Sequence, residues 1–129
     1  MRISTYMHGV MDYVIGLALL VAPILFRFSG TPATVARTIG VIILLQAVMT
    51  RFEVGLVKII PMRVHLMMDY VIGAILAASP WLFGFSDAPV NAWAPHLVVG
   101  LLIIAQAAIT AAPRADVTVM DRDRPRRAA

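Results

Sequence analysis

Long apolar stretches alternate with short polar or turn-forming segments along the whole chain. The apolar stretches cover about residues 8–29, 34–54, 65–86 and 93–112. Glycine, proline or charged residues separate them, at residues 29–32, 58–63 and 86–89. Each stretch has roughly the 20 residues that an α-helix needs to cross the hydrocarbon core of a bilayer. The pattern therefore predicts four membrane-spanning helices joined by short loops.

The first and third apolar stretches are near copies of each other. Residues 8–16, HGVMDYVIG, recur as HLMMDYVIG in residues 65–73, at an offset of 57. The second and fourth stretches also match, at an offset of 60. A unit of two spans re-enters the membrane from the same side, so we expect two parallel-repeated helical hairpins, about 8–54 and 65–112. The predicted fold is all-α, a polytopic membrane four-helix bundle in residues 1–113.

Composition agrees with this fold, and charge predicts its orientation. Hydrophobic residues make up 60% of the chain and charged residues 14%, which is too apolar for an ordinary soluble domain. Of the 11 lysines and arginines, all but Arg27 and Arg37 lie on the side of the termini and the middle loop. Because cytoplasmic loops carry the excess of positive charge, both termini are expected in the cytoplasm. Asp12 inside the first stretch, and the copy of that stretch at 65–86, favour a span over a cleaved secretory signal.

The polar segments indicate what the chain contacts outside the bilayer core. Residues 114–129 are polar and basic, and we expect a disordered cytoplasmic tail. Residues 51–60 mix charged and apolar side chains, which is typical of a helix end lying on the membrane surface. The expected partners are the lipid bilayer and the anionic headgroups that attract this loop and tail. We also expect that copies of the chain can associate through helix faces. No basic, aromatic-laced surface predicts nucleic-acid binding.

Ionisable residues inside the predicted spans are the strongest indication of a site. His8 and Asp12 lie four residues apart and so share one helix face, and the repeat places His65 and Asp69 in the same way. Further polar residues follow these pairs or lie near the ends of the second and fourth spans. They are Tyr13, Gln46, Thr50, Tyr70, Gln106 and Thr110.

These residues are predicted to form one polar layer in the cytoplasmic half of the bundle. At 1.5 Å per residue, antiparallel neighbours place His8 near the depth of Thr50, and Asp12 near that of Gln46. The second hairpin repeats the arrangement. We therefore expect Asp12 to bond to Gln46 or His65, and its copy Asp69 to bond to Gln106 or His8.

Three interpretations of the polar layer remain open. In the first, the carboxylates accept hydrogen bonds and hold the two hairpins in register, as interhelical polar contacts do in membranes. In the second, the two Asp–His pairs form a proton or cation relay in a small transporter or channel. In the third, His8 and His65 clamp a haem or a metal ion between symmetry-related helices.

The other features of the spans concern anchoring. Pro23 and Pro80 are expected about two turns from the outer ends of their helices, where each would kink the helix. Trp81 is expected to anchor the bundle at the interface. Other aromatic residues are predicted to join it in an outer belt, namely Phe26, Phe28, Phe83, Phe85 and Trp93. His96 is expected in the outer loop, as an interfacial residue without metal-ligand partners.

The second hairpin contains the motif Ser-Pro-Trp-Leu-Phe-Gly-Phe-Ser at residues 79–86, preceded by Asp-Tyr-Val-Ile-Gly at 69–73. This motif resembles the repeat of the SPW family of small bacterial membrane proteins. The first hairpin departs from the motif, because Ala22-Pro23-Ile24 replaces Ser-Pro-Trp. The resemblance implies a four-span protein of the bacterial inner membrane, without an established biochemical activity. It implies no catalytic residue.

The sequence as a whole predicts a structural or interaction bundle, with the transporter and the haem or metal protein as alternatives. The chain has no cysteine, which excludes thiolate metal sites and cysteine nucleophiles. It also lacks a phosphate loop, a nucleophile elbow and a zinc signature. We therefore expect no enzymatic activity, and the sequence commits to neither a cofactor nor a metal ligand. It names no substrate.

Overall fold

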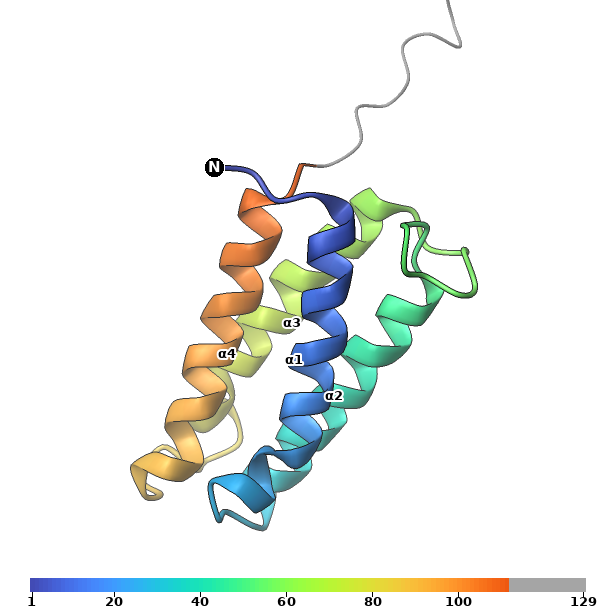
Figure 1. The fold of residues 1–129 in the computed structure, drawn as a ribbon. Helices are drawn as coiled ribbons and strands as arrows, with labels where there is room; N and C mark the ends of the chain where they lie inside the picture. The colour runs from blue at the N-terminus through green and yellow to red at the C-terminus, as the bar shows by residue number, and fades with distance from the viewer. Residues whose placement is uncertain (112–129) are drawn as a thin grey trace, which may run out of the picture.

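A computed structural model describes residues 1–111, and these residues form four α-helices (Figure 1). The helices are α1 (Thr5–Leu25), α2 (Thr31–Met49), α3 (Met62–Leu82) and α4 (Val90–Ile109). The all-α bundle predicted from the sequence is confirmed. Each helix begins about three residues before the apolar stretch that predicted it, because polar and turn residues also enter the first turns. The expected basic tail, 114–129, lies outside the described residues.

All four helices are long and apolar enough to cross a membrane. They contain between 19 and 21 residues, and no 18-residue window that qualifies them carries more than two charged side chains. At a rise of about 1.5 Å per residue, such helices match a hydrocarbon core about 30 Å thick. The chain is therefore a multi-pass membrane protein. Its helix ends define a terminal end, where α1 begins and α4 ends, and a loop end, where the two hairpin loops lie (Figure 1).

Local sequence signals explain where the helices begin and end. The Ser4 hydroxyl accepts a hydrogen bond from the Met7 N–H and caps α1. Pro32 lies in the first turn of α2, where a missing N–H is harmless. Gly30 and Gly84 have φ angles of +69° and +72°, so the two hairpin loops turn through conformations that favour glycine.

Within each hairpin, two facing glycines allow the helices to approach closely. Gly16 of α1 faces Gly40 of α2, and a Cβ added at Gly40 would lie 2.8 Å from the Gly16 carbonyl oxygen. Gly73 of α3 faces Gly100 of α4 in the same way, with 2.6 Å between an added Cβ and the Gly73 oxygen. Small residues of this kind let helix backbones pack in membranes.

Replacing Gly100 with alanine should therefore separate α3 from α4. The obstacle is backbone rather than a flexible side chain, because the new Cβ would also overlap the Ala77 backbone nitrogen. We expect a loss of about 1–3 kcal/mol of stability, the usual cost of overpacking. Thermal unfolding in detergent measures it. The control Ala105→Val adds bulk to an exposed position of α4. Equal stability of both variants and the wild type would contradict close packing at Gly100.

Backbone hydrogen bonds tie the two hairpins together at the terminal end. Ile3, before α1, donates to the Ile109 carbonyl at 3.0 Å and accepts from Ala111 at 3.1 Å. Ile60, before α3, is joined in the same way to the end of α2, accepting from Arg51 at 2.8 Å. These bonds link α4 to α1 and α2 to α3. The two hairpins thus have the same arrangement and run in parallel. In each, the residues just before the first helix bond to the end of the second helix of the other hairpin.

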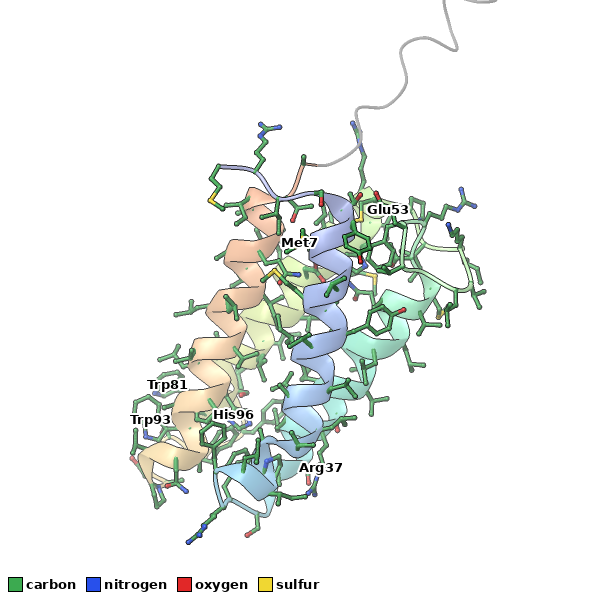
Figure 2. The ribbon with its side chains drawn as sticks, in the orientation of Figure 1. Met7, Arg37, Glu53, Trp81, Trp93 and His96 are labelled. Carbon is green, nitrogen blue, oxygen red and sulfur yellow. The ribbon has the colours of Figure 1, made fainter. Side chains whose placement is uncertain are left out.

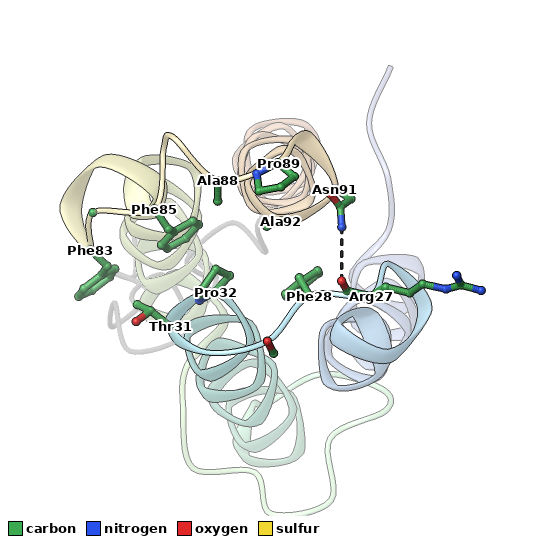
Figure 3. A pocket seen from close by; sticks show the side chains of 12 residues that line it. Arg27, Phe28, Thr31, Pro32, Phe83, Phe85, Ala88, Pro89, Asn91 and Ala92 are labelled. Carbon is green, nitrogen blue, oxygen red and sulfur yellow. Dashed lines mark hydrogen bonds between the residues drawn. The ribbon is translucent and has the colours of Figure 1, made fainter.

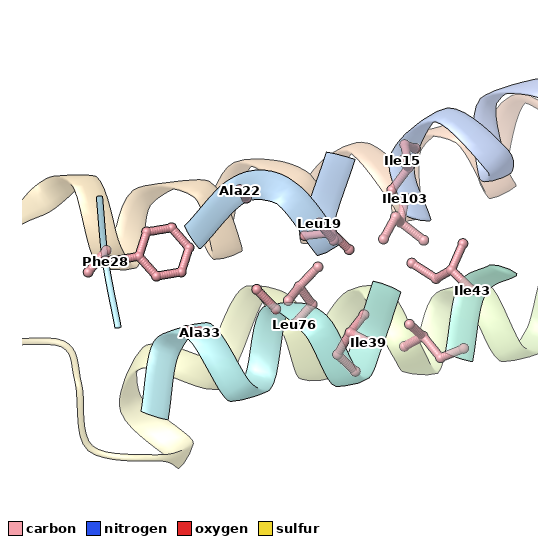
Figure 4. Close-up of a cluster of buried hydrophobic side chains, with 12 residues drawn as sticks. Ile15, Leu19, Ala22, Phe28, Ala33, Ile39, Ile43, Leu76 and Ile103 are labelled. Carbon is pink, nitrogen blue, oxygen red and sulfur yellow. The ribbon is translucent and has the colours of Figure 1, made fainter. Parts of the chain in front are cut away.

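The half of the bundle toward the loop end is filled with apolar side chains (Figure 4). Leu19 and Leu76 lie at equivalent positions of α1 and α3 and are 2% and 0% exposed. Around them pack further buried residues from all four helices, including Ile15, Ile39, Ile43, Ile72 and Ile103. The two buried polar side chains of this half, Ser79 and His96, lie within hydrogen-bonding distance of backbone carbonyls.

The two helix prolines lie nearer the helix ends than the sequence predicted. Pro23 and Pro80 are each two residues from the last residue of α1 and α3, rather than two turns. The predicted position, two turns from the helix end, is therefore wrong, and a proline in the last turn leaves most of its helix undisturbed. In α3, the Ser79 hydroxyl donates to the Leu76 carbonyl at 2.7 Å, which satisfies the oxygen that Pro80 leaves without an N–H partner.

The predicted aromatic belt is only partly present. Trp81 is 60% exposed at the loop end, as an interfacial anchor would be (Figure 2). Phe28 and Phe85 instead are buried and pack on both sides of His96, with ring centroids 5.6 Å and 4.9 Å from the imidazole.

His96 itself was misplaced by the sequence analysis. It lies within α4 rather than in the loop, and only 1% of it is exposed. Its Nδ1 lies 2.8 Å from the Ala92 carbonyl, and its Nε2 lies 2.9 Å from the Pro32 carbonyl. The helix begins at Val90 because Pro89 supplies its N-cap, which draws the loop residues into the first turns.

Candidate functional site

Four ionisable side chains meet in the interior of the terminal half. They are His8 and Asp12 of α1 with His65 and Asp69 of α3, and none is more than 4% exposed. Their converging atoms are the two imidazole Nε2 atoms and the two carboxylate Oδ2 atoms. The Nε2 atoms lie 3.1 Å apart. Each Nε2 lies 3.0 Å from the Oδ2 of the other hairpin and 3.3 Å from the Oδ2 of its own. We call this group the His–Asp centre.

Two threonines determine which ring nitrogen of each histidine carries a proton. The Thr50 hydroxyl donates to the Gln46 carbonyl at 2.6 Å. A hydroxyl has a single proton, so Thr50 Oγ1 must accept at its second contact, 2.7 Å from His65 Nδ1. The proton of a neutral His65 therefore lies on Nδ1, and the Nε2 lone pair faces the centre. Thr110 holds His8 in the same way, with contacts of 2.6 Å and 2.7 Å.

Two glutamines hold the aspartates in a matching way. The Gln106 side-chain amide donates to Asp12 Oδ1 at 2.7 Å and to the His8 carbonyl at 3.3 Å. The same distances join Gln46 to Asp69 Oδ1 and to the His65 carbonyl. One oxygen of each carboxylate is thus satisfied, and the other, Oδ2, is turned into the centre.

The His–Asp centre therefore contains acceptors without donors. Both Oδ2 atoms are buried and have no hydrogen-bond partner. The Nε2 atoms lie near them, but the tautomer imposed by the threonines places the ring protons on the opposite side of each ring. Two negative charges and two lone pairs facing one another in a low-dielectric interior are unfavourable unless a positive charge lies between them.

Most of the residues predicted for this layer lie in it, but some of them have other partners than predicted. The predicted contacts of Asp12 with His65, and of Asp69 with His8, are present. The glutamine partners come from the opposite hairpin, so the expected Asp12–Gln46 and Asp69–Gln106 bonds are replaced by Asp12–Gln106 and Asp69–Gln46. The bundle orders its helices so that α4 lies beside α1, and this neighbour supplies the amide.

The two tyrosines of the predicted layer point away from it. Tyr13 donates from its hydroxyl to the Val54 carbonyl at 3.0 Å, in the middle loop. Tyr70 is 44% exposed on the outside of α3. Each follows an aspartate directly, and adjacent residues face different sides of a helix.

The loop between α2 and α3 covers the His–Asp centre, which the sequence analysis missed. It was expected to lie on the membrane surface, yet Phe52 is only 6% exposed, with its ring centroid 5.7 Å from that of His65. The ring packs against Gly9, where any Cβ would overlap it. The Thr5 hydroxyl donates to the Glu53 carboxylate, whose two oxygens both lie 2.8 Å from it, and this contact holds the loop to α1. The sequence contains one signal of this cover. Position 9 is glycine, whereas the corresponding position of the other repeat is Leu66.

A second feature, at the loop end, is a cavity of about 440 Å³ between the two hairpin loops (Figure 3). Its lining includes Phe28, Pro32 and Phe85, and Asn91 spans it by donating to the Phe26 carbonyl at 2.8 Å. The Arg27 side chain points away from it (Figure 3). It gathers no ligand-bearing side chains comparable to those of the His–Asp centre.

The arrangement does not fit a haem between the two histidines. An iron bound by two imidazoles at about 2 Å each needs its two nitrogens about 4 Å apart, with a wide macrocycle in between. The Nε2 atoms lie 3.1 Å apart, and the carboxylates occupy the space beside them. The haem alternative is therefore not supported.

The fold and the polar layer define a class of protein, a four-span membrane bundle built from two copies of one hairpin. The family model of the SPW repeat domain matches residues 6–110, and the chain belongs to that family. The resemblance drawn from residues 69–86 is confirmed. No curated protein matched the chain. No solved structure matched it either.

Proposed function

We propose that this protein binds a cation at the His–Asp centre, within the terminal half of the membrane-spanning bundle. The observation that carries the proposal is the pair of buried Oδ2 atoms without donors, facing two Nε2 lone pairs. The threonines and glutamines occupy the outward-facing atoms of the same four residues. A layer that only held helices together would pair its acceptors with donors, and this one leaves its inner acceptors for a positive charge.

The surrounding structure supports binding rather than passage across the membrane. The half toward the loop end is filled mainly with apolar side chains, and its buried polar side chains, Ser79 and His96, already contact backbone carbonyls. Toward the terminal end, the centre is separated from the outside by Phe52 and the ends of the helices. We infer that the cation enters and leaves on the terminal side. A binding role also needs no nucleophile or phosphate loop, in accord with the expectation that the chain is not an enzyme.

A thermal-unfolding comparison tests the proposal. A cation that binds only the folded state stabilises it, by about 2.7 kcal/mol when its concentration is 100 times its dissociation constant. We expect the unfolding temperature of the wild type to rise with proton or metal-ion concentration. The double variant Asp12→Asn/Asp69→Asn should lose this dependence, because an amide can still accept from Gln106 or Gln46 but carries no charge.

The matched control for the thermal comparison is Asp87→Asn, at an exposed position of the loop between α3 and α4. It should respond to cations as the wild type does. If wild type and double variant unfold at the same temperature at every pH and in every cation, cation binding is refuted. The layer would then hold the hairpins in register, as the structural interpretation of the sequence has it.

We further propose that the terminal end faces the cytoplasm of a bacterial cell, across its inner membrane. The charge distribution of the described residues supports this orientation, since Arg2, Arg51, Lys58 and Arg63 belong to the segments at the terminal end, against Arg27 and Arg37 toward the loop end. The chain has no cysteine, so single cysteines can be placed at Ile59, in the middle loop, and at Asp87, in the second hairpin loop. A membrane-impermeant thiol reagent added to intact cells stripped of their outer barrier should label only the cysteine at 87. Labelling at 59 alone would reverse the orientation.

A further inference from the structure

We infer that the cation at the His–Asp centre is a divalent transition-metal ion in four-coordinate geometry, of the zinc type. It would be held by His8 Nε2, His65 Nε2, Asp12 Oδ2 and Asp69 Oδ2. This inference rests on the proposed cation-binding function and names its ligand. It follows from the spacing of the four atoms, their chemistry, their charge and the residues that orient them.

The spacing matches a tetrahedral site. Four ligands about 2.0 Å from a zinc ion lie about 3.3 Å from one another. Five of the six separations in the centre are 3.0, 3.0, 3.1, 3.3 and 3.3 Å. The sixth, between the two carboxylate oxygens, lies within 4.8 Å. Five of the six separations are therefore already close to those that a bound ion requires, and the two carboxylate oxygens complete the set when they lie about 3.3 Å apart.

The orientation of the ligands matches a metal site as well. A metal-bound imidazole usually donates its other N–H to a fixed acceptor, which sets the tautomer, and a metal-bound carboxylate is usually hydrogen-bonded through its other oxygen. Thr50 and Thr110 are those acceptors for the two histidines. Gln46 and Gln106 are the matching donors for the two aspartates.

The charge of the centre selects a divalent ion. Two aspartates contribute two negative charges and two neutral histidines contribute none, so one divalent ion makes the group neutral in the membrane interior. A single proton shared between the Nε2 atoms would leave one negative charge uncompensated. Protons on both Nε2 atoms would also balance the two carboxylates, through ion pairs of 3.0 Å with the Oδ2 of the other hairpin. They would, however, place two N–H groups and two positive rings against each other across 3.1 Å.

The donor types exclude the common hard cations as the preferred occupant. Calcium takes six to eight oxygen ligands, and magnesium requires octahedral oxygen coordination with several waters. The centre offers two imidazole nitrogens and two carboxylate oxygens, all buried. Imidazole suits zinc, copper, iron and nickel, and a closed set of four ligands without geometric strain suits zinc best.

Cobalt substitution tests the geometry directly. The full chain would be purified in detergent, stripped with a chelator and titrated with Co²⁺, and visible absorption would be recorded. Tetrahedral Co²⁺ absorbs far more strongly than octahedral Co²⁺. We expect an intense visible band that saturates at one ion per chain and disappears when one equivalent of Zn²⁺ is added. Asp12→Asn should weaken Zn²⁺ binding at least 100-fold, and Asp87→Asn should leave it unchanged.

Several outcomes would overturn the metal inference. They are a weak octahedral spectrum, equal Zn²⁺ affinity in wild type and Asp12→Asn, and no Zn²⁺ binding by a protein whose helical circular dichroism is intact. If the stability of that protein still rises with proton concentration through Asp12 and Asp69, the cation is a proton and only the metal inference fails. If neither protons nor metal ions stabilise the wild type over Asp12→Asn/Asp69→Asn, both proposals fail together.

Discussion

Replacing Thr50 with valine is expected to weaken metal binding at the His–Asp centre by about 10-fold to 100-fold, the usual effect of removing a group that orients a ligand. Valine has nearly the shape of threonine but cannot accept the His65 Nδ1–H, which lies 2.7 Å from the hydroxyl. The imidazole is then free to change tautomer or rotate. The same substitution at Thr110 should release His8, and the double variant should lose more than either single variant.

The Thr50→Val variant also has a readout that does not depend on a metal. Leaving the buried His65 N–H without an acceptor should lower the free energy of unfolding of the metal-free protein by about 1–3 kcal/mol. Zn²⁺ titration calorimetry and thermal unfolding measure the two effects. Thr34→Val is the control, because its hydroxyl bonds at an exposed position to the Gly30 carbonyl. Unchanged Zn²⁺ affinity in Thr50→Val would show that the threonine does not orient His65.

Replacing Gly9 with leucine, the residue at the corresponding position of the other repeat, is expected to displace the cover of the His–Asp centre. Any Cβ at Gly9 would overlap the Phe52 ring, and Val54 closes the other side. We expect a loss of about 1–3 kcal/mol of stability from overpacking. We also expect faster release of bound metal to a chelator, because Phe52 no longer lies against His65. Stopped-flow absorption of the Co²⁺ form follows the release.

A second variant separates displacement of the cover from general damage to α1. Gly9→Leu combined with Phe52→Ala restores the space, so stability should partly recover while release stays fast, giving a clear interaction energy in a double-mutant cycle. Ala18→Leu places the same side chain at an exposed position of α1 and should change neither quantity. A slow release in both Gly9→Leu and Phe52→Ala would mean that Phe52 does not cover the path of the ion.

The polar layer shows what a repeated motif predicts about a site and what it leaves undetermined. The four-residue spacing of His8 and Asp12, repeated 57 residues later, was sufficient to predict one buried layer at one depth. Helical spacing gives depth along the axis, and antiparallel neighbours share it. It does not say which neighbouring helix supplies the glutamine, because that depends on the order of helices around the bundle. The amide of Gln106 therefore reaches Asp12 across the hairpins.

Positions near helix ends were the least predictable. His96 was expected in a loop and lies buried within α4, while Pro23 was expected about two turns from the end of its helix and lies in the last turn of α1. A helix in a membrane includes polar residues wherever their backbone groups can still be bonded, so an apolar stretch locates the span better than its ends. The burial of Phe52 was not predicted for a related reason. A loop sequence that mixes charged and apolar residues does not indicate which side chain packs against the helices.

The sequence by itself determined the class of fold, the repeated motif and all members of the polar layer except the two tyrosines, because span length, repeat offset and helical spacing are properties of the chain alone. Only the tertiary structure decided that His8, His65, Asp12 and Asp69 converge on one point with their inner atoms unpaired. That outcome depends on the close approach at Gly40 and Gly100, which sets the rotation and distance of each helix. Distances of about 3 Å between atoms of two hairpins are fixed by packing in three dimensions, which no spacing along a chain encodes.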